Sequence, residues 1–293
     1  VFTGAGVAII TPMHADGSVN YAELGRIIDD QIEHGTDAII ICGTTGESAT
    51  LTHEEHVECI RFAVEHTARR VPVVAGTGSN DTAYAVKLSQ HAEEVGADAL
   101  LLVTPYYNKA SQAGLIAHFS AIANAVSLPC ILYNVPSRTG CNILPATLAE
   151  LCKLPNINGV KEASGNLAQV SEIAALCGDE LNIYSGEDGL ILPIMALGGK
   201  GVISVLSNVA PQYTHDICAA WLDGDAARCR TLQLGALELV HALFADVNPI
   251  PVKWAMNRLG WDAGPLRLPL CPPSPAVQQQ LETALKNFGL LKD

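Results

Sequence analysis

The sequence predicts an α/β protein, a (β/α)8 TIM barrel followed by a C-terminal helical region. Eight short apolar runs alternate with segments of helical spacing, a pattern typical of βα units and a parallel sheet. Eight such units in roughly 210 residues match the size of a closed barrel. An open doubly wound sheet is disfavoured because no G-x-G-x-x-G motif follows the first run.

The eight apolar runs are the expected strands, and polar or turn-forming residues follow them. They span residues 6–10, 38–42, 71–75, 99–103, 130–133, 157–160, 181–184 and 201–205. Helices are expected over residues 21–34, 81–95, 111–126, 145–151, 167–177 and 190–197. One further helix is expected to begin at Thr52, where Glu55 three positions later completes a capping-box pattern.

The pattern changes after Pro211. Residues 226–244, 251–259 and 275–288 have helical patterns with no strand between them, and a Gly- and Pro-rich stretch over 260–275 joins the last two. We therefore predict two regions, a catalytic barrel over residues 1–224 and a helical region over residues 225–293.

Charge and composition exclude several classes of protein. Acidic residues outnumber basic ones by 30 to 17, and no Lys/Arg-rich run is present, which argues against nucleic acid or an anionic membrane as a partner. Neither a leader at Val1 nor a bilayer-spanning apolar run is expected. Nine cysteines occur singly without a C-x-x-C pair, which indicates reduced thiols in a cytoplasmic protein.

The stretch from Asn158 to Gly165 places a lysine at a strand end. Lys161 follows the apolar run over residues 157–160, and the C-terminal strand ends of a barrel carry its chemistry. Desolvation favours the neutral amine, and a shift of ~3 pKa units corresponds to about 4 kcal/mol. Lys161 is therefore a candidate Schiff-base nucleophile. The alternative is a lysine whose stem packs on the sheet while its ammonium reaches water.

Polar groups that end the other strands are expected to share one rim with Lys161. They are Thr44, Thr45, Tyr106, Tyr107, Tyr133, Arg138, Gly186 and Ser204. This set suits a carbonyl-condensing enzyme, because an imine on lysine makes the adjacent carbon acidic and a tyrosine can move protons. A glycine-rich turn over residues 43–46 offers N–H groups for one carboxylate, and arginine offers a bidentate site for a second.

Each of these features also has a structural interpretation. The segment over residues 43–48 is compatible with an ordinary βα turn, Tyr106–Tyr107 with simple packing, and Arg138 with a surface ion pair. Glu187 and Asp188 are expected to cap a helix rather than bind a metal. His53 and His56 lie three residues apart without an evident third ligand, so a solvated helix face is preferred to zinc and no metal site is predicted.

Three segments together resemble a known family. Residues 43–48, 133–140 and 160–165, read as GTTGES, YNVPSRTG and VKEASG, are similar to the pyruvate-dependent class I aldolase and lyase family, in particular to its dihydrodipicolinate synthase branch. The resemblance extends from Phe2 to the NPIPVK segment at residues 248–253. The first and third segments mark the superfamily, and the SRTG element is more specific to the synthases.

The resemblance implies catalytic roles for Lys161, Tyr133, Thr44 and Tyr107 and a pyruvate-binding role for Thr45. Lys161 would form the Schiff base with pyruvate, and Thr44 and Thr45 would hold the pyruvate carboxylate. Tyr133, Thr44 and Tyr107 would form a proton relay in which the neighbouring subunit supplies Tyr107.

The resemblance also implies the second substrate and the assembly. Arg138 would bind the carboxylate of L-aspartate 4-semialdehyde, and backbone groups of Gly186 and Ile203 would line the site. The expected reaction is condensation with pyruvate to 4-hydroxy-tetrahydrodipicolinate, the committed step toward diaminopimelate and lysine. The expected enzyme is a lyase without cofactor, assembled as a homotetramer of two tight dimers.

A regulatory site for lysine is a further implication of the resemblance. The matching positions are Ser48, Ala49, His53, His56, Asn80, Tyr84 and Tyr106. Lysine-sensitive relatives carry a glutamate at the position of Tyr84. Weak or absent inhibition is therefore expected, because a neutral phenol offers the ligand's ammonium a hydrogen bond or cation–π contact in place of an ion pair.

Two alternatives remain open on the same scaffold. A sister aldolase, such as N-acetylneuraminate lyase or a keto-sugar-acid aldolase, would share Lys161, Tyr133 and the turn over residues 43–48. Arg138 distinguishes the two, since sugar acids require hydroxyl-binding groups. A non-enzymatic sensor of small acids would be expected to lack the lysine or the tyrosine.

Overall fold

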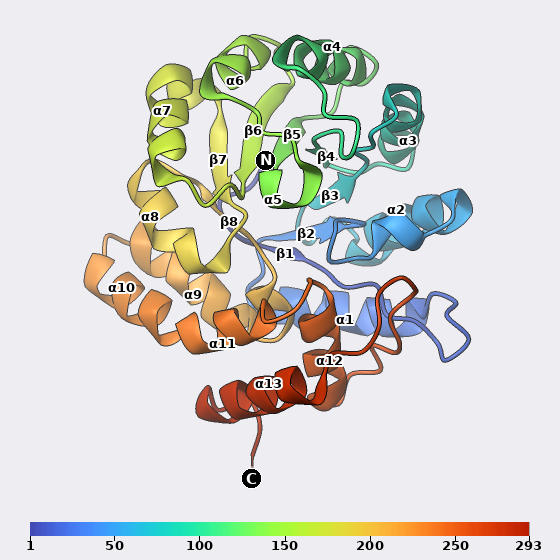
Figure 1. Cartoon of the computed structure of the whole chain (residues 1–293), viewed down its shortest axis with the longest axis vertical. Coiled ribbons are helices and arrows are strands. Elements are labelled where there is room, and N and C mark those ends of the chain that lie inside the picture. The colour runs from blue at the N-terminus through green and yellow to red at the C-terminus, as the bar shows by residue number, and fades with distance from the viewer. Residues whose placement is uncertain (293) are drawn as a thin grey trace.

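The computed structural model describes residues 1–292 and has a closed barrel of eight parallel strands. The strands are β1 (Gly4–Ala8), β2 (Ala38–Ile41), β3 (Val73–Gly76), β4 (Ala99–Val103), β5 (Cys130–Asn134), β6 (Ile157–Glu162), β7 (Asn182–Ser185) and β8 (Gly201–Ser204). Each strand pairs with the next, and β8 pairs back onto β1. Helices surround the strands (Figure 1). The predicted (β/α)8 barrel is confirmed.

The helices agree with the sequence prediction over most of the barrel. They are α1 (Tyr21–Glu33), α2 (His53–Thr67), α3 (Thr82–Glu94), α4 (Gln112–Ala123), α5 (Pro136–Thr139), α6 (Pro145–Leu151), α7 (Leu167–Cys177) and α8 (Ile191–Ala196). The predicted capping box at α2 is present, because Thr52 and Glu55 each accept a backbone N–H from the other. The four-residue helix α5 occupies what the sequence suggested was only a turn.

The last helices differ more from prediction. They are α9 (Pro211–Leu222), α10 (Ala226–Gly235), α11 (Leu237–Leu243), α12 (Ile250–Arg258) and α13 (Pro275–Asn287). Helix α9 was not predicted; it packs against β1 and completes the outer ring. The single helix expected over residues 226–244 is instead two helices that meet at Ala236.

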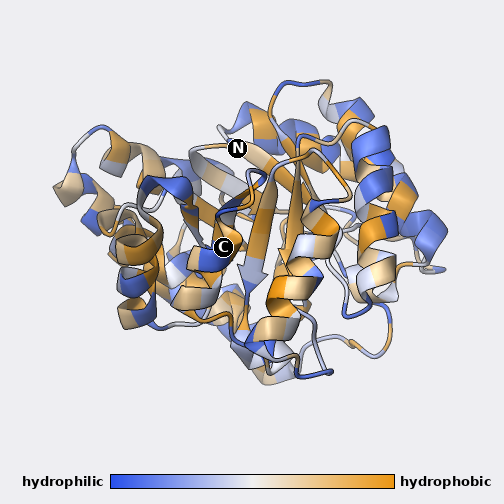
Figure 2. Cartoon of the chain, turned by 90° about the horizontal axis from the view of Figure 1, so that it is seen from above, coloured by the Kyte–Doolittle hydropathy of each residue, from blue (hydrophilic) through white to orange (hydrophobic). Residues whose placement is uncertain are grey.

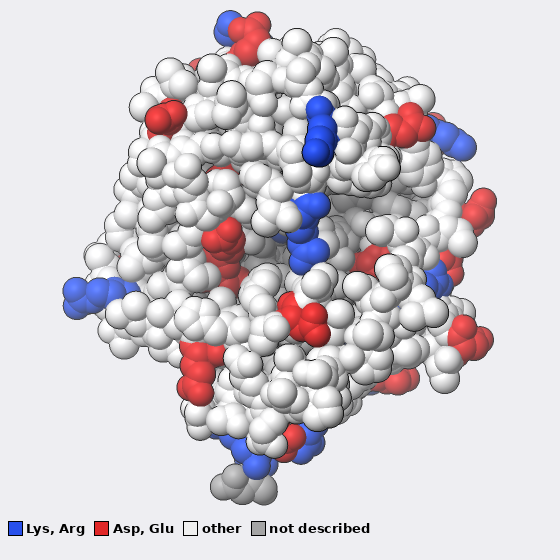
Figure 3. All heavy atoms as spheres, viewed as in Figure 1, with Lys and Arg blue, Asp and Glu red and all other residues white. Residues whose placement is uncertain are grey.

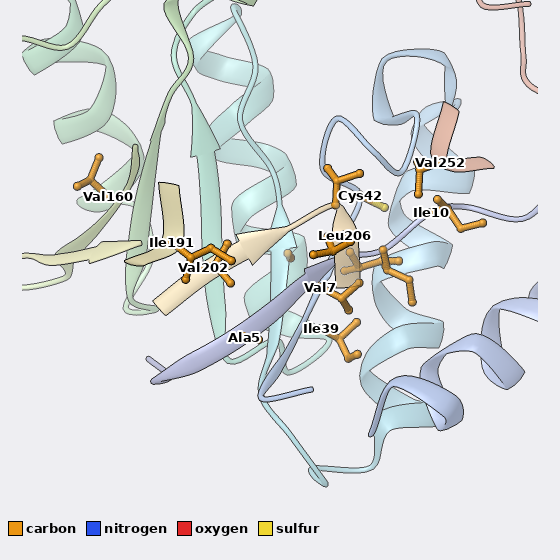
Figure 4. Packing of buried hydrophobic residues seen from close by; sticks show 14 of the residues in the cluster. Ala5, Val7, Ile10, Ile39, Cys42, Val160, Ile191, Val202, Leu206 and Val252 are labelled. Atoms are coloured by element: carbon orange, nitrogen blue, oxygen red, sulfur yellow. The ribbon is translucent and has the colours of Figure 1, made fainter. Parts of the chain in front are cut away.

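Side chains of the strands divide between two hydrophobic clusters. Because neighbouring residues of a strand point to opposite faces, Val160 packs outward against the helices, whereas Ile131, Tyr133 and Tyr184 belong to the barrel interior. Figure 2 shows the strands largely hydrophobic and the surrounding helices mixed in hydropathy. Figure 4 shows part of the outer cluster between strands and helices.

The C-terminal helices pack onto the barrel. Val252 of α12 belongs to the same cluster as Ile10 and Cys42, with which it is drawn in Figure 4. Helix α13 in turn packs on α11 and α12 through Leu281 and Leu285. No helix within residues 1–292 is long and apolar enough to cross a membrane.

Candidate active site

Lys161 lies in the barrel interior near the C-terminal end of β6. Strand register places it beside Tyr133 of β5 and Tyr184 of β7. The Lys161 Nζ atom is 4.3 Å from the centre of the Tyr133 ring, and only 6% of the residue is exposed. Tyr184 in turn stacks on Phe2 and donates a hydrogen bond of 2.7 Å to the Phe2 carbonyl. The lysine therefore has a buried tyrosine on each neighbouring strand.

Burial makes the Lys161 amine unusually acidic. Desolvation lowers its pKa to about 7, although the Asp188 carboxylate raises it, and the Arg138 guanidinium lowers it further. A substantial fraction of the amine is therefore neutral near pH 7, the form that attacks a carbonyl carbon. The alternative of an ammonium reaching water is excluded by the burial of the residue.

The glycine at position 186 makes room for this lysine. A Cβ atom at Gly186 would lie 2.7 Å from the Ala163 Cβ and 3.2 Å from the Lys161 Cε. Such contacts are too close for a side chain, so glycine allows the loop after β7 to approach the lysine stem.

Tyr133 is a proton-bearing group close to the amine. It is 7% exposed, and burial raises its pKa while Arg138 and the Thr44 side chain lower it. The phenol is therefore protonated at neutral pH and has both a cation and a hydroxyl close by. This arrangement suits a residue that gives and takes back a proton.

The turn after β2 presents two free backbone donors. Within it, the Gly46 amide donates to the Gly43 carbonyl and the Glu47 amide to the Thr44 carbonyl. No group within residues 1–292 accepts from the amides of Thr44 or Thr45. Successive backbone N–H groups in a turn form a concave anion site, so this turn can hold a carboxylate.

Arg138 lies on the exposed side of the site. It is carried by α5, and its Nη2 atom donates to the carbonyl of Asn248 at 3.0 Å. A cavity of about 400 Å³ joins it to the lysine, and its lining includes Thr44, Thr45, Tyr133, Arg138, Lys161, Gly186, Glu187 and Asn248. Figure 3 shows a hollow on this face with basic and acidic atoms near its edge.

Three of the predicted rim residues, Tyr106, Tyr107 and Ser204, lie outside this cavity, as does Ile203, which the resemblance had added. Tyr107 is 89% exposed and has a positive φ of 73°, so its ring lies on the protein surface. Ile203 is fully buried in the barrel interior. The hydroxyl of Ser204 donates to Asp188 at 2.5 Å, and Ser204 itself does not line the cavity.

The prediction that Glu187 and Asp188 cap a helix is wrong. Helix α8 begins after Leu190 without a side-chain cap. Asp188 instead accepts the amides of Val205 and Leu206, because its buried carboxylate is turned toward β8. Glu187 faces the cavity, and burial together with the nearby Glu162 and Asp188 raises its pKa.

Asn248 is a lining residue that the sequence did not identify as part of the site. Its Nδ2 atom donates to the Thr45 hydroxyl at 3.0 Å, while its backbone carbonyl accepts from Arg138. It comes from the segment before α12. The NPIPVK segment, which begins with Asn248, is part of the family resemblance and could have pointed to this residue. The sequence does not indicate, however, that this segment reaches the barrel rim.

The candidate regulatory residues gather around a second cavity of about 470 Å³. Ser48, Ala49, His56, Tyr84 and Tyr106 line it. His53 contacts Tyr84, with 3.3 Å between Nδ1 and the phenol oxygen, and Asn80 donates to the Tyr106 carbonyl at 3.1 Å.

The expectation of a solvated face is wrong for His56. This histidine is 5% exposed, and its Nε2 atom lies 2.7 Å from the Gly76 carbonyl, because α2 packs its His56 side against β3. Within residues 1–292, no group of three or more His, Cys, Asp or Glu side chains is arranged to hold a metal ion.

Comparisons with known proteins point to one family. The sequence profile of the dihydrodipicolinate synthetase family matches residues 1–288. A 4-hydroxy-tetrahydrodipicolinate synthase of Lachnoclostridium phytofermentans is 60% identical over 292 residues, which are 99% of both chains. The crystal structure of dihydrodipicolinate synthase from Aquifex aeolicus is 46% identical with a TM-score of 0.97, covering 100% of both chains. The enzyme from Cyanidioschyzon merolae with lysine bound is 41% identical with a TM-score of 0.96 over 99% of both chains.

Proposed function

Because this chain belongs to the dihydrodipicolinate synthetase family, we propose that it condenses pyruvate with L-aspartate 4-semialdehyde to 4-hydroxy-tetrahydrodipicolinate. It is a lyase of the class I aldolase type, and its reaction serves diaminopimelate and lysine biosynthesis. The observation that carries the proposal is the buried Lys161, whose pKa of about 7 and position beside Tyr133 suit imine chemistry.

The first step is imine formation. The neutral Lys161 amine attacks the keto carbon of pyruvate, and loss of water from the resulting carbinolamine leaves a protonated imine. The pyruvate carboxylate binds the free amides of Thr44 and Thr45, which fixes the keto carbon in front of the amine. Tyr133 supplies the proton that the departing hydroxyl requires.

The second step joins the two substrates. The iminium draws electrons, so the methyl group of the bound pyruvate loses a proton to the Tyr133 phenolate and the iminium becomes an enamine. The enamine carbon forms a bond to the aldehyde carbon of the semialdehyde, and the aldehyde oxygen takes up the proton from Tyr133. The semialdehyde's amine then replaces the Lys161 nitrogen at the imine carbon, which closes the ring and frees the enzyme.

Arg138 is proposed to orient the semialdehyde. Its guanidinium is exposed, reaches the cavity and is braced by the Asn248 carbonyl. Bidentate contact with the substrate carboxylate would hold the aldehyde toward Lys161. The sister aldolases act on sugar acids, and the family comparisons favour the synthase over that alternative.

The proposal is tested by a direct assay. Purified protein is incubated with pyruvate and L-aspartate 4-semialdehyde, and product formation is followed by mass spectrometry. Parallel incubations with N-acetylneuraminate and a keto-sugar acid serve as controls. Consumption of pyruvate and the semialdehyde together is expected, without turnover of either sugar acid; faster turnover of a sugar acid would assign the chain to the sister aldolases.

Tyr107 is proposed to act in the site of a neighbouring subunit. Its 89% exposure and its absence from the cavity of its own chain support this role. We expect inactive Tyr107→Phe and Lys161→Met proteins to regain part of their activity when mixed subunits form. Native mass spectrometry verifies the hybrids, and an inactive hybrid would contradict a shared site.

A cytoplasmic homotetramer is proposed for the assembly and location. The cysteines within the described chain are all unpaired, which supports a reducing compartment. The large exposure of Tyr106, Tyr107 and Leu268 supports a subunit contact on this side of the barrel.

Lysine is proposed to be a weak inhibitor at the second cavity. Burial, Glu54 and Tyr106 raise the pKa of Tyr84, so its phenol is neutral and offers no charge to the ligand's ammonium. Loss of a charge-assisted contact lowers affinity by about ten- to a hundredfold. A lysine titration of the condensation rate should therefore show little inhibition below millimolar concentrations.

The matched variants are Tyr84→Glu and Tyr84→Phe. The glutamate should strengthen inhibition, whereas the phenylalanine should not. Strong inhibition of the unmodified protein would contradict the proposal. Glu54, whose charge raises the pKa of Tyr84, would then be the candidate partner of the ligand's ammonium. Glu54→Gln would then abolish that inhibition.

A further inference from the structure

An ion pair between Lys253 and Glu47 lies entirely inside the protein. The Lys253 Nζ and Glu47 Oε1 atoms are 2.6 Å apart, and each side chain is 1% exposed. No other ion pair within residues 1–292 buries both partners so completely. The two residues are 206 positions apart, so the pair joins the C-terminal helices to the first part of the barrel.

Glu47 ends the turn that carries Thr44 and Thr45. Its backbone is left-handed, with φ 54° and ψ 33°, a conformation that costs free energy in a residue other than glycine. The Glu47 amide donates to the Thr44 carbonyl at 3.1 Å. Its second carboxylate oxygen accepts the amide of Arg267 at 2.9 Å. The side chain therefore fixes the end of the turn from two directions.

Lys253 is tied to the other groups that hold substrate carboxylates. It lies in α12, where its amide donates to the Pro249 carbonyl at 3.0 Å, directly after Asn248. Asn248 contacts the Thr45 hydroxyl through its side chain and Arg138 through its carbonyl. A displacement of α12 would therefore move both carboxylate-binding groups at once.

Stability alone is a poor explanation for this pair. Taking two charges out of water costs about as much as their attraction returns, and apolar residues of similar size often serve as well. A buried pair does, however, fix one relative position of two segments, because either charge without its partner is strongly unfavourable. The contacts of Glu47 and Lys253 fix the turn over residues 43–47 relative to the start of α12, the two segments that carry Thr45 and Asn248.

We propose that the Lys253–Glu47 ion pair is a positioning device that holds the start of α12 against the turn over residues 43–47, so that Asn248 aligns Thr45 with Arg138. The substrate part of this inference rests on the proposed function. Loss of the pair weakens the binding of both substrates together, whereas loss of Arg138 weakens only the second.

The test compares Lys253→Met, the double variant Glu47→Gln/Lys253→Met, and Leu285→Ala as a control. Leu285 is fully buried in α13, and its truncation lowers Tm without touching the turn. The double variant leaves no uncompensated buried charge. It therefore carries the test if the single variant does not fold.

Two measurements separate positioning from a purely structural role. In the double variant, amide hydrogen exchange of the turn should be about 10- to 100-fold faster, and KM should rise about 10- to 100-fold for both substrates with a smaller change in kcat. Leu285→Ala should change Tm but neither quantity. The inference is overturned if the double variant keeps the exchange rates of the turn and both KM values of the unmodified protein.

The exchange measurement needs no substrate. If the unmodified protein fails to condense the semialdehyde, the proposed function is wrong, and the exchange rates still decide whether the pair holds the turn. Faster exchange with unchanged KM values would also contradict the inference, because the turn would then move without consequence for binding.

Discussion

Lys161→Met is expected to abolish the trapping of pyruvate by borohydride and to lower the condensation rate by more than about 10³-fold. The unmodified protein should gain one reduced pyruvyl group per chain, on the peptide that contains Lys161. The effect is large because the lysine supplies the covalent intermediate itself, which no neighbouring group replaces. Trapping on another lysine would remove the mechanism proposed above.

The same variant should be more stable than the unmodified protein. The folded pKa of Lys161, about 7, lies below the ordinary value of 10.5, so the unfolded chain binds more protons between these pH values. Stability of the unmodified protein therefore rises with pH across that window. A difference of three and a half units corresponds to about 5 kcal/mol at most. Lys161→Met should therefore show a raised Tm near pH 7, and the gain should disappear as the pH approaches 10.5.

The rate of imine formation follows the same titration. It should rise with pH and level off above about 7, since only the neutral amine attacks pyruvate. This dependence is measured as the single-turnover rate of pyruvate trapping between about pH 5.5 and 9, a range that covers both sides of the pKa of about 7. A plateau reached only above pH 9 would show that burial does not lower the pKa of Lys161.

Arg138→Ala is expected to reduce kcat/KM for the semialdehyde by about 10²-fold or more. The arginine would otherwise contribute two charge-assisted hydrogen bonds to the substrate carboxylate. Trapping of pyruvate by borohydride should change little, because Thr44 and Thr45 hold that carboxylate instead. Fold stability should also change little, since the side chain is exposed.

Arg138→Lys is the matched control for this prediction. It keeps the positive charge but loses the planar pair of donors, so it should restore only a small part of the activity. Near-normal condensation by Arg138→Ala would return the substrate assignment to the sister aldolases.

The sequence predicted most of the barrel because each strand and helix carries its own local signal. The strand at Ile157–Glu162 followed from an apolar run, and α2 from its capping box. Helix α9 was missed because residues 211–222 were assigned to no element. Its first turn contains polar residues, and only contact with β1 identifies it as the eighth barrel helix.

The site was predictable where function is carried by residues in short motifs, and not where it depends on distant parts of the chain. Lys161, Tyr133 and Arg138 line one cavity as the alternation of strands and turns suggested. Asn248 and Glu47 were not singled out, because their partners are more than 100 positions away. His56 was misjudged for a similar reason, since its burial depends on β3 rather than on its own helix.

The groups proposed to perform the chemistry and those proposed to select the second substrate differ in how tightly the fold holds them. Lys161 lies in a strand bonded on both sides, beside a buried tyrosine. Arg138 comes from a four-residue helix, and its exposed side chain is held by a single hydrogen bond to the Asn248 carbonyl. A replacement at position 138 therefore leaves the core intact, whereas a change around the lysine disturbs packed strands. Substitutions in the outer loops can therefore change which aldehyde the barrel accepts, while the proposed pyruvate enamine on Lys161 stays the same.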